Sequence, residues 1–195
     1  RRQTERVLPM VDELLAAAGV TLASLDAIAF SQGPGAFTGV RVAVSIAQGL
    51  GFAADVPLLG VSTLACTAQA AALAHGAGHW LVAQDARMGE LYVGQYRLVE
   101  GEQVVQACAA DVLLSPEALA DLPAGNWRGV GSGALYLDTL RARWPSLGDW
   151  FDDIGPRAGA MLPLAQAALQ RGEVVAAEQA RPVYLRNQVI QGAIR

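Results

Sequence analysis

Apolar residues along the chain follow two spacings, one typical of helices and one typical of buried strands. Residues 6–18 carry valine, leucine and methionine at helical spacing over so wide an arc that we expect this helix to bury two faces. Pro9 should begin its regular part or kink it, because proline lacks a backbone N–H, and Gly19 follows as a stop. A buried strand is predicted at residues 27–30, and a second helix, rich in small residues, at residues 38–54.

The remaining pattern predicts an α/β protein with two lobes, because strands and helices alternate along it. Ser115-Pro116-Glu117 is typical of a helix start, with a capping hydroxyl, a proline in the first turn and an acid near the helix dipole. The glycine-rich break at Gly76-Ala77-Gly78 predicts a lobe boundary, with residues 1–76 in the first lobe, residues 77–181 in the second, and residues 182–195 returning to the first. The other predicted elements are strands at 58–61, 81–83 and 90–98 and helices at 62–74 and 160–171.

The composition excludes several classes of function. The chain has 195 residues, 53% of them hydrophobic, and a net charge of −4. All 14 basic residues are arginine, which excludes a Schiff-base lysine and the lysine of a phosphate-binding P-loop. Because no basic cluster occurs, the chain should bind RNA poorly by itself. No stretch approaches the apolar length that a membrane span needs. Cys66 and Cys108 lie far apart in the sequence without the spacing of a metal site, so we expect both to be buried, reduced thiols, as in a cytoplasmic protein.

A glycine-rich loop joins the strand predicted at residues 27–30 to the helix that follows it. Backbone N–H groups at such a helix start can bind phosphate. The spacing, G-x-G-x-x-x-G, differs from the dinucleotide-binding fingerprint, and no acid follows the next strand to hold a ribose. Chemistry alone therefore favours a structural turn, with ligand binding as the alternative. The candidate residues of this loop are Gly33, Pro34, Gly35, Phe37, Thr38, Gly39 and Arg41.

Five blocks distributed along the chain carry a family resemblance. They are residues 33–41 (GPGAFTGVR), 47–50 (AQGL), 57–64 (PLLGVSTL), 85–90 (DARMGE) and 182–186 (PVYLR). Together, and in this order, they resemble the TsaB family, which is also called YeaZ. Five separately placed blocks are far more specific than any one glycine motif.

The resemblance implies a two-lobe fold of the class that contains actin, Hsp70, acetate kinase and the sugar kinases, with a ribonuclease-H-like motif in each lobe. It also implies that the family's first strands precede Arg1, so we expect the first lobe to be incomplete. No cofactor is expected, although residual binding of ATP or ADP between the lobes stays open.

The resemblance further implies that the chain is an inactive relative of the enzyme TsaD. TsaD carries a His-x-x-x-His metal pair after the corresponding strand, and alignment places Thr63 and Thr67 at those two positions. A threonine hydroxyl is a poor ligand for a transition metal compared with imidazole, so neither a metal nor a catalytic residue is expected. The two histidines, His75 and His79, are separated by the glycine-rich break, which argues against a metal site on a helix.

TsaD and TsaE are the partners that the resemblance implies. With TsaB they transfer a threonylcarbamoyl group, made by TsaC or a relative, to an adenosine beside the tRNA anticodon, and TsaD performs the chemistry. The helices at residues 7–18 and 38–54 are our candidates for the partner contact, and the same surface could form a homodimer. tRNA would be reached only through the complex. The predicted contact residues are Leu8, Val11, Leu15, Val42, Ser45 and Gly49.

The block at residues 85–90 has two interpretations. Asp85, Arg87 and Glu90 either pair with one another around a turn or contact a ligand, and pairing is favoured. Two other functions are alternatives for the whole chain. An active ATP-dependent phosphotransferase of the same superfold needs acids beside the phosphates that this chain lacks, and a nucleotide-dependent oxidoreductase needs a ribose-binding acid and a tighter glycine spacing.

Overall fold

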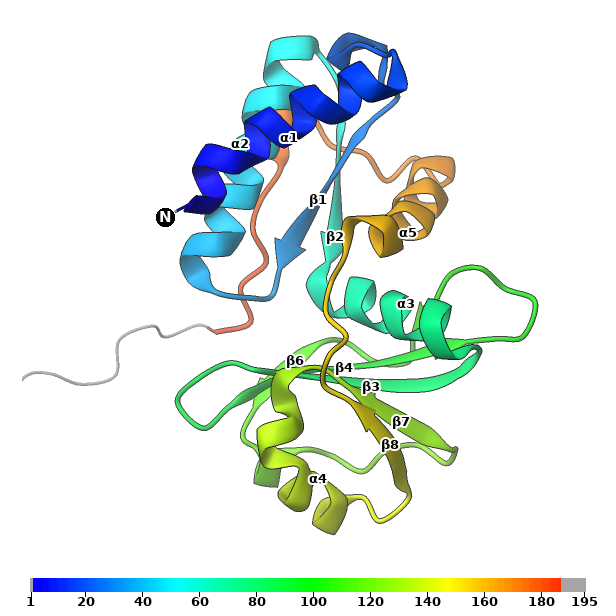
Figure 1. Ribbon diagram of the computed structural model, residues 1–195. Coiled ribbons are helices and arrows are strands. Elements are labelled where there is room, and N and C mark those ends of the chain that lie inside the picture. Colours follow the sequence, from blue (N-terminus) through cyan, green and yellow to red (C-terminus); the bar gives the residue numbers. More distant parts are fainter. Residues whose placement is uncertain (1, 187–195) are drawn as a thin grey trace, which may run out of the picture.

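The computed structural model describes residues 2–186 and has two sheets, which lie one above the other in Figure 1. The first sheet pairs β1 (Ile28–Gly33) in parallel with β2 (Leu58–Ser62), and α2 (Phe37–Ala54) connects them. A parallel pair requires such a crossover, because the chain must return to the same end of the sheet. Both strands and the helix were predicted within a few residues.

The second sheet has six strands in the order β5-β4-β3-β7-β8, with β6 also paired to β4. β3 pairs antiparallel with β4, whereas β3 with β7 and β7 with β8 are parallel. This mixture is that of a ribonuclease-H-like motif, as the resemblance implies. The strands are β3 (Gly78–Asp85), β4 (Leu91–Leu98), β5 (Gln106–Ala107), β6 (Val112–Leu114), β7 (Trp127–Val130) and β8 (Leu147–Phe151).

α3 (Thr63–His75) lies between the two sheets and joins their cores (Figure 1). Its small buried side chains pack with Leu59 of β2 on one side and with Trp80 and Val82 of β3 on the other. α5 (Ala158–Gln170) packs against α3 and β2. On the opposite face of the second sheet, α4 (Leu137–Arg143) and the 3₁₀ helices η2 (Pro116–Ala118) and η3 (Ser132–Tyr136) surround a separate core.

The chain returns to the first sheet earlier than residue 182. α5 already contacts β2. After α5, Val175 forms a β-bridge with Leu58, and the 3₁₀ helix η4 (Ala177–Gln179) packs on α2. These contacts bury Ala177 in a third core with Phe30. Of the predicted returning segment, residues 187–195 lie outside the described residues.

α1 (Arg2–Ala18) begins before Pro9 and runs through it, so Pro9 does not start the helix, and the alternative of a kink there stays a prediction. α1 also does not bury two faces among the side chains that the structure describes. Val7, Val11 and Leu15 are half-buried, while neighbouring leucines stay exposed. These three residues are spaced four apart, so they form one stripe along the helix, which a single contacting surface can cover. The other apolar residues of α1 can be buried only by another partner.

The helix predicted to start at Ser115 is only the one-turn 3₁₀ helix η2. The Ser115 hydroxyl makes no capping hydrogen bond, and Leu119 is already extended. Leu119 is buried in the core around α4, so tertiary packing overrides the local helix signal.

Two further expectations need correction. Cys66 is buried, and burial raises the pKa of its thiol, but Cys108 is exposed.

α2 is long and apolar enough to cross a membrane by length and composition alone, contrary to the expectation that no stretch approached the length of a membrane span. One such helix is weak evidence, because the core helix of a soluble protein passes the same test, and α2 packs Val40, Val44 and Ala47 into the third core.

Candidate functional site

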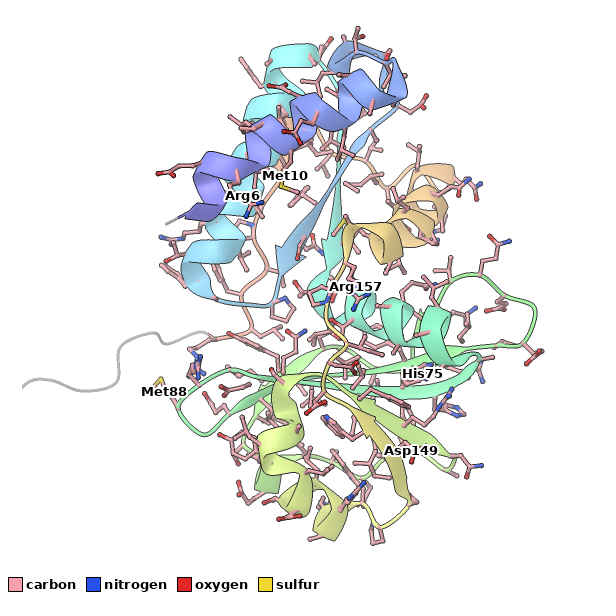
Figure 2. The ribbon with its side chains drawn as sticks, viewed as in Figure 1. Arg6, Met10, His75, Met88, Asp149 and Arg157 are labelled. Carbon is pink, nitrogen blue, oxygen red and sulfur yellow. The ribbon has the colours of Figure 1, made fainter. Side chains whose placement is uncertain are left out.

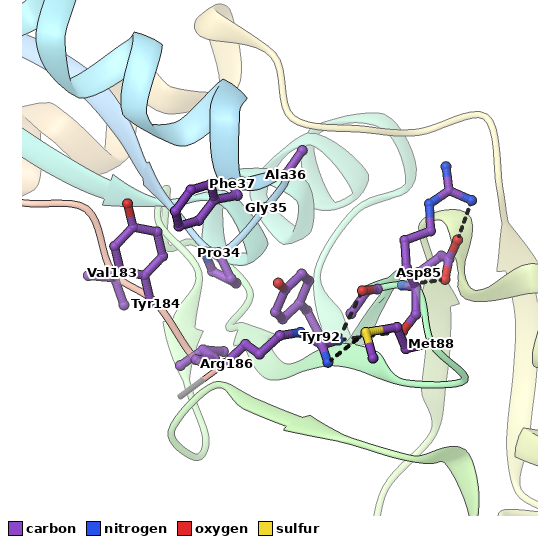
Figure 3. Close-up of a pocket in the computed structure, with 13 residues that line it drawn as sticks. Pro34, Gly35, Ala36, Phe37, Asp85, Met88, Tyr92, Val183, Tyr184 and Arg186 are labelled. Carbon is purple, nitrogen blue, oxygen red and sulfur yellow. Dashed lines mark hydrogen bonds and ion pairs between the residues drawn. The ribbon is translucent and has the colours of Figure 1, made fainter. Parts of the chain in front are cut away.

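Three segments that are distant in the sequence meet around one cavity (Figure 3). They are the glycine loop, the turn between β3 and β4, and residues 182–186, which we call the C-terminal strap. The cavity has a volume of about 430 Å³. Its lining residues are Pro34, Gly35, Ala36, Phe37, Asp85, Ala86, Arg87, Met88, Tyr92, Val183, Tyr184, Leu185 and Arg186.

The C-terminal strap packs closely against Gly33, the first residue of the glycine loop. Gly33 has a φ of 104°, and a Cβ added to it would lie 2.7 Å from the carbonyl oxygen of Val183. Beside it, the N–H of Val183 donates to the carbonyl oxygen of Gln32 at 2.7 Å. Glycine at this position therefore allows the strap to run directly along the end of β1.

The rest of the glycine loop divides between the cavity wall and α2. The N-cap residue Ala36 has no side chain that could accept from the first helical N–H groups. This end of α2 therefore presents backbone donors, and its first turn contains no acidic residue. The cavity is lined by Pro34, Gly35 and Phe37, and the exposed first turns of α2 hold Thr38, Gly39 and Arg41.

Arg41 connects α2 to the strap. Its Nε donates to the hydroxyl of Tyr184 at 2.8 Å, and its guanidinium carbon lies 3.7 Å from the centre of the Phe37 ring. The Phe37 and Tyr184 rings are themselves 5.5 Å apart. The arginine thus joins two aromatic side chains that lie far apart in the sequence.

The three charged residues of the β3–β4 turn all have partners within the chain. Arg87 pairs with Asp85 at 3.1 Å, and the Asp85 carboxylate also accepts from the Arg87 N–H at 2.9 Å. Glu90 pairs instead with Arg186 of the strap. Of the three residues predicted to pair or to bind a ligand, Asp85 and Arg87 therefore line the cavity and are paired with each other. Glu90 lies outside the lining and is paired with the strap.

The six predicted contact residues of α1 and α2 differ in exposure. Leu8, Ser45 and Gly49 are exposed, and a Cβ added to Gly49 would meet no atom within 4 Å. The other three, which are Val11, Leu15 and Val42, are half-buried. The predicted contact thus includes both open positions and positions that already pack against the protein.

Thr63 and Thr67, which the resemblance aligns with the two TsaD histidines, belong to a chain of hydrogen bonds. The Thr63 hydroxyl lies 2.7 Å from that of Ser31 at the end of β1. The Thr67 hydroxyl donates to the Thr63 carbonyl at 2.8 Å and accepts from the Gln84 amide at 3.1 Å. Both threonines are buried, so these bonds satisfy hydroxyls that water does not reach.

The two histidines lie against different aromatic rings. His75, the last residue of α3, stacks on Phe151 with ring centres 3.8 Å apart. His79, in β3, lies 4.9 Å from the ring centre of Trp127. Within residues 2–186, no group of three or more histidine, cysteine, aspartate or glutamate side chains could hold a metal ion.

Sequence reasoning missed a partly buried polar cluster at the start of α3. The Ser62 hydroxyl accepts from the N–H groups of Leu64 and Ala65 and donates to the Asp111 carboxylate at 2.8 Å. Tyr96 donates to the same carboxylate at 2.6 Å. Burial raises the pKa of Asp111, although these hydrogen bonds partly oppose the shift, and burial together with the carboxylate raises the pKa of Tyr96.

The contacts of Arg186, which lies in the block at residues 182–186, were not predicted from the sequence either. Both Asp111 and Arg186 meet partners that lie far away in the sequence, at Ser62 and at the β3–β4 turn. The capping serine at residue 62, just before an apolar helix, was the one local signal for the first cluster. No local pattern indicates the second.

Comparison with known proteins identifies the family. Residues 1–136 match the family model described as TsaD, tRNA N6-adenosine threonylcarbamoyltransferase. The tRNA threonylcarbamoyladenosine biosynthesis protein TsaB of Escherichia coli K12 is 39% identical over 97% of this chain and 83% of its own length. The protein of the same name from Haemophilus influenzae is 40% identical over 97% of this chain and 82% of its own length.

Solved structures agree with these sequence relatives. YeaZ from Pseudomonas aeruginosa superposes with a TM-score of 0.87 and 44% identity, covering 95% of this chain and 85% of that one. A second structure, of a protein described as similar to the peptidase YeaZ from the same organism, gives a TM-score of 0.86 at 45% identity over 93% of this chain and 83% of that one. The two-lobe actin-like fold class that the sequence predicted is confirmed. The chain belongs to the TsaB (YeaZ) family of tRNA threonylcarbamoyladenosine biosynthesis proteins.

Proposed function

We propose that this chain is a non-catalytic subunit that binds TsaD and activates it to form N6-threonylcarbamoyladenosine beside the tRNA anticodon. The observation that carries the proposal is the apolar surface that α1 and α2 leave exposed. Leu8 is 48% exposed, Leu14 68% and Phe52 79%. Large exposed apolar side chains gathered on two helices favour a protein partner.

The shape of α2 suits close contact with another helix. Gly49 leaves its part of the helix surface open, and Ser45 is a small exposed residue one turn earlier. A shallow hollow of about 310 Å³ continues this surface towards the glycine loop, between Phe37 and Ile46. Small residues allow helix backbones to approach one another, and side chains of a partner helix could enter the hollow.

The buried threonines support a non-catalytic role. Thr63 and Thr67 stand where the resemblance places the metal-binding histidines of TsaD, and their hydroxyls are already engaged with Ser31 and Gln84. Buried hydroxyls that are already hydrogen-bonded are poor ligands for a transition metal. In this proposal TsaD holds the metal and performs the transfer, TsaC or a relative supplies the threonylcarbamoyl group, and TsaE completes the complex.

The proposal also covers location and self-association. We place the protein in the cytoplasm, where tRNA is modified, and expect it to meet tRNA only through its partners, since its net charge is −4. Without TsaD, the same helical surface would pair two copies around a two-fold axis.

A glycine substitution tests the contact surface. Gly49→Leu should weaken the binding of TsaD by steric overlap, while leaving the fold intact, because the position is open in this chain. Gly159→Leu is the matched control, since Gly159 lies in α5 and its Cβ position is also open. Calorimetric titration with TsaD should show weaker binding for the first variant and native affinity for the second. Equal affinities for both variants would refute the predicted surface, and turnover of ATP by this chain alone would favour the phosphotransferase alternative.

A further inference from the structure

The turn between β3 and β4 has an unusual backbone. Arg87 has a φ of 64° and Met88 a φ of 59°, and both precede Gly89 with a φ of 75°. Glycine adopts this left-handed conformation readily, but residues with a Cβ seldom do. Burial does not hold the two residues in place, because the Arg87 side chain is 88% exposed and Met88 is 65% exposed. The Asp85 carboxylate accepts from the Arg87 N–H and holds the start of the turn, but the rest of the turn needs a further contact.

Arg186 of the C-terminal strap supplies that contact (Figure 3). Its guanidinium pairs with the Glu90 carboxylate, donates to the Ala86 carbonyl at 3.0 Å and lies 3.6 Å from the Met88 sulfur. The Arg186 side chain is only 17% exposed. A planar guanidinium can satisfy several acceptors at once, so one residue fixes both sides of the turn.

The other end of the strap is fixed on the first lobe. Val183 donates to Gln32 at the end of β1, and Tyr184 accepts from Arg41 of α2 while its ring packs beside Phe37. Only one residue, Leu185, lies between the attachments at Tyr184 and Arg186. Such a short segment has little slack, so movement at one attachment must be felt at the other.

We propose that the C-terminal strap is a latch, in which Arg186 holds the β3–β4 turn in its left-handed conformation and Arg41 makes this hold depend on α2. Release of the strap lets the turn relax to an ordinary conformation and removes one wall of the cavity. The strap thereby connects the surface of α2 with the second lobe. This inference concerns the isolated chain and does not depend on the binding of TsaD.

Amide hydrogen exchange measures the state of the latch directly. The reporter amides are Ala86 and Glu90, which close the turn through hydrogen bonds to Glu90 and Arg87, and Val183 in the strap. Arg186→Ala should speed exchange at all three by about tenfold or more, because a charge-assisted hydrogen bond is lost. Arg181→Ala is the matched control, since Arg181 bonds only to nearby carbonyls of Glu178 and Ala180 among the described residues. Unchanged exchange in the turn of Arg186→Ala would overturn the proposal.

A second variant tests the connection with α2. Arg41 contacts Phe37 and Tyr184 rather than the turn, so Arg41→Ala should speed exchange at Ala86 and Glu90 only if the strap transmits the change. Faster exchange there supports the latch, whereas an effect confined to α2 and the strap overturns it. If Arg186→Ala does not fold, Arg186→Lys provides the same measurement, because lysine keeps the charge but lacks the planar fork. These experiments use this chain alone, so their failure would leave the proposed binding of TsaD untouched.

Discussion

The guanidinium carbon of Arg128 lies 3.9 Å from the centre of the buried Trp80 ring, across the end of α3. From this position the guanidinium donates to the carbonyl oxygens of His75 at 2.8 Å, Gly76 at 3.1 Å and Ala77 at 2.7 Å. The last carbonyls of a helix lack intrahelical donors, so Arg128 serves as the C-terminal cap of α3. Figure 2 shows His75 at this end of the helix, above the second sheet.

Replacing Arg128 should therefore destabilise the folded protein. We expect Arg128→Ala to lower the free energy of unfolding by about 1–3 kcal/mol, because it removes both the cap and the cation–π contact. Arg128→Lys should lose less, since it retains the charge over the ring. Urea unfolding monitored by tryptophan fluorescence checks both values. An alanine variant as stable as the native protein would show that the contacts are not stabilising.

Two glycines in α2 should respond in opposite directions to alanine. Gly49 is open, so Gly49→Ala should stabilise the helix by about 0.5–1 kcal/mol through its better helix propensity. At Gly51, a Cβ would lie 2.7 Å from a methyl carbon of Leu58 and 2.8 Å from the Val56 carbonyl oxygen. Gly51→Ala should therefore destabilise the protein by about 1–3 kcal/mol through overpacking. Thermal unfolding of the two variants should shift to opposite sides of the native midpoint, and a common direction would contradict the packing of α2 on β2.

The partly buried Asp111 should make stability depend on pH. Its pKa is raised by burial, so the folded state binds a proton more tightly than the unfolded state does. Stability should then be greatest below the ordinary aspartate pKa of about 3.9 and fall as the pH rises through the raised pKa. Asp111→Asn cannot titrate and should lack this contribution, although it loses one of the two accepted hydrogen bonds.

The difference between the two proteins isolates Asp111 from the other carboxylates. Urea unfolding from pH 4 to pH 8 should show the native protein losing stability relative to Asp111→Asn as the pH rises. A difference that stays constant over this range, or that changes in the opposite direction, would contradict the raised pKa.

The regular elements of the first lobe were largely predictable, because their signals are local. The apolar runs at β1 and β2 and the helical spacing at α2 and α3 each lie within one segment, and the observed bounds differ from the predicted ones by a few residues. Helix ends were predictable where a residue type has a local effect, as at Gly19 and Gly76.

The failures have a common cause, which is that contacts between distant segments are not encoded in local spacing. Ser115 begins only a single turn, because Leu119 is needed in the core around α4. The apolar arc of α1 correctly predicted a helix but could not show which part of it the protein itself covers. The cavity likewise depends on Arg186 reaching Glu90, a pairing that neither residue's neighbours indicate.

The most direct test of the account is an assay of threonylcarbamoyl transfer to tRNA, with TsaC, TsaD and TsaE present and this chain either added or left out. We predict that transfer requires both TsaD and this chain, that Gly49→Leu lowers the activation in proportion to its weaker binding, and that this chain without TsaD transfers nothing. Transfer by TsaD at the same rate without this chain, or transfer by this chain in the absence of TsaD, would contradict the proposed role.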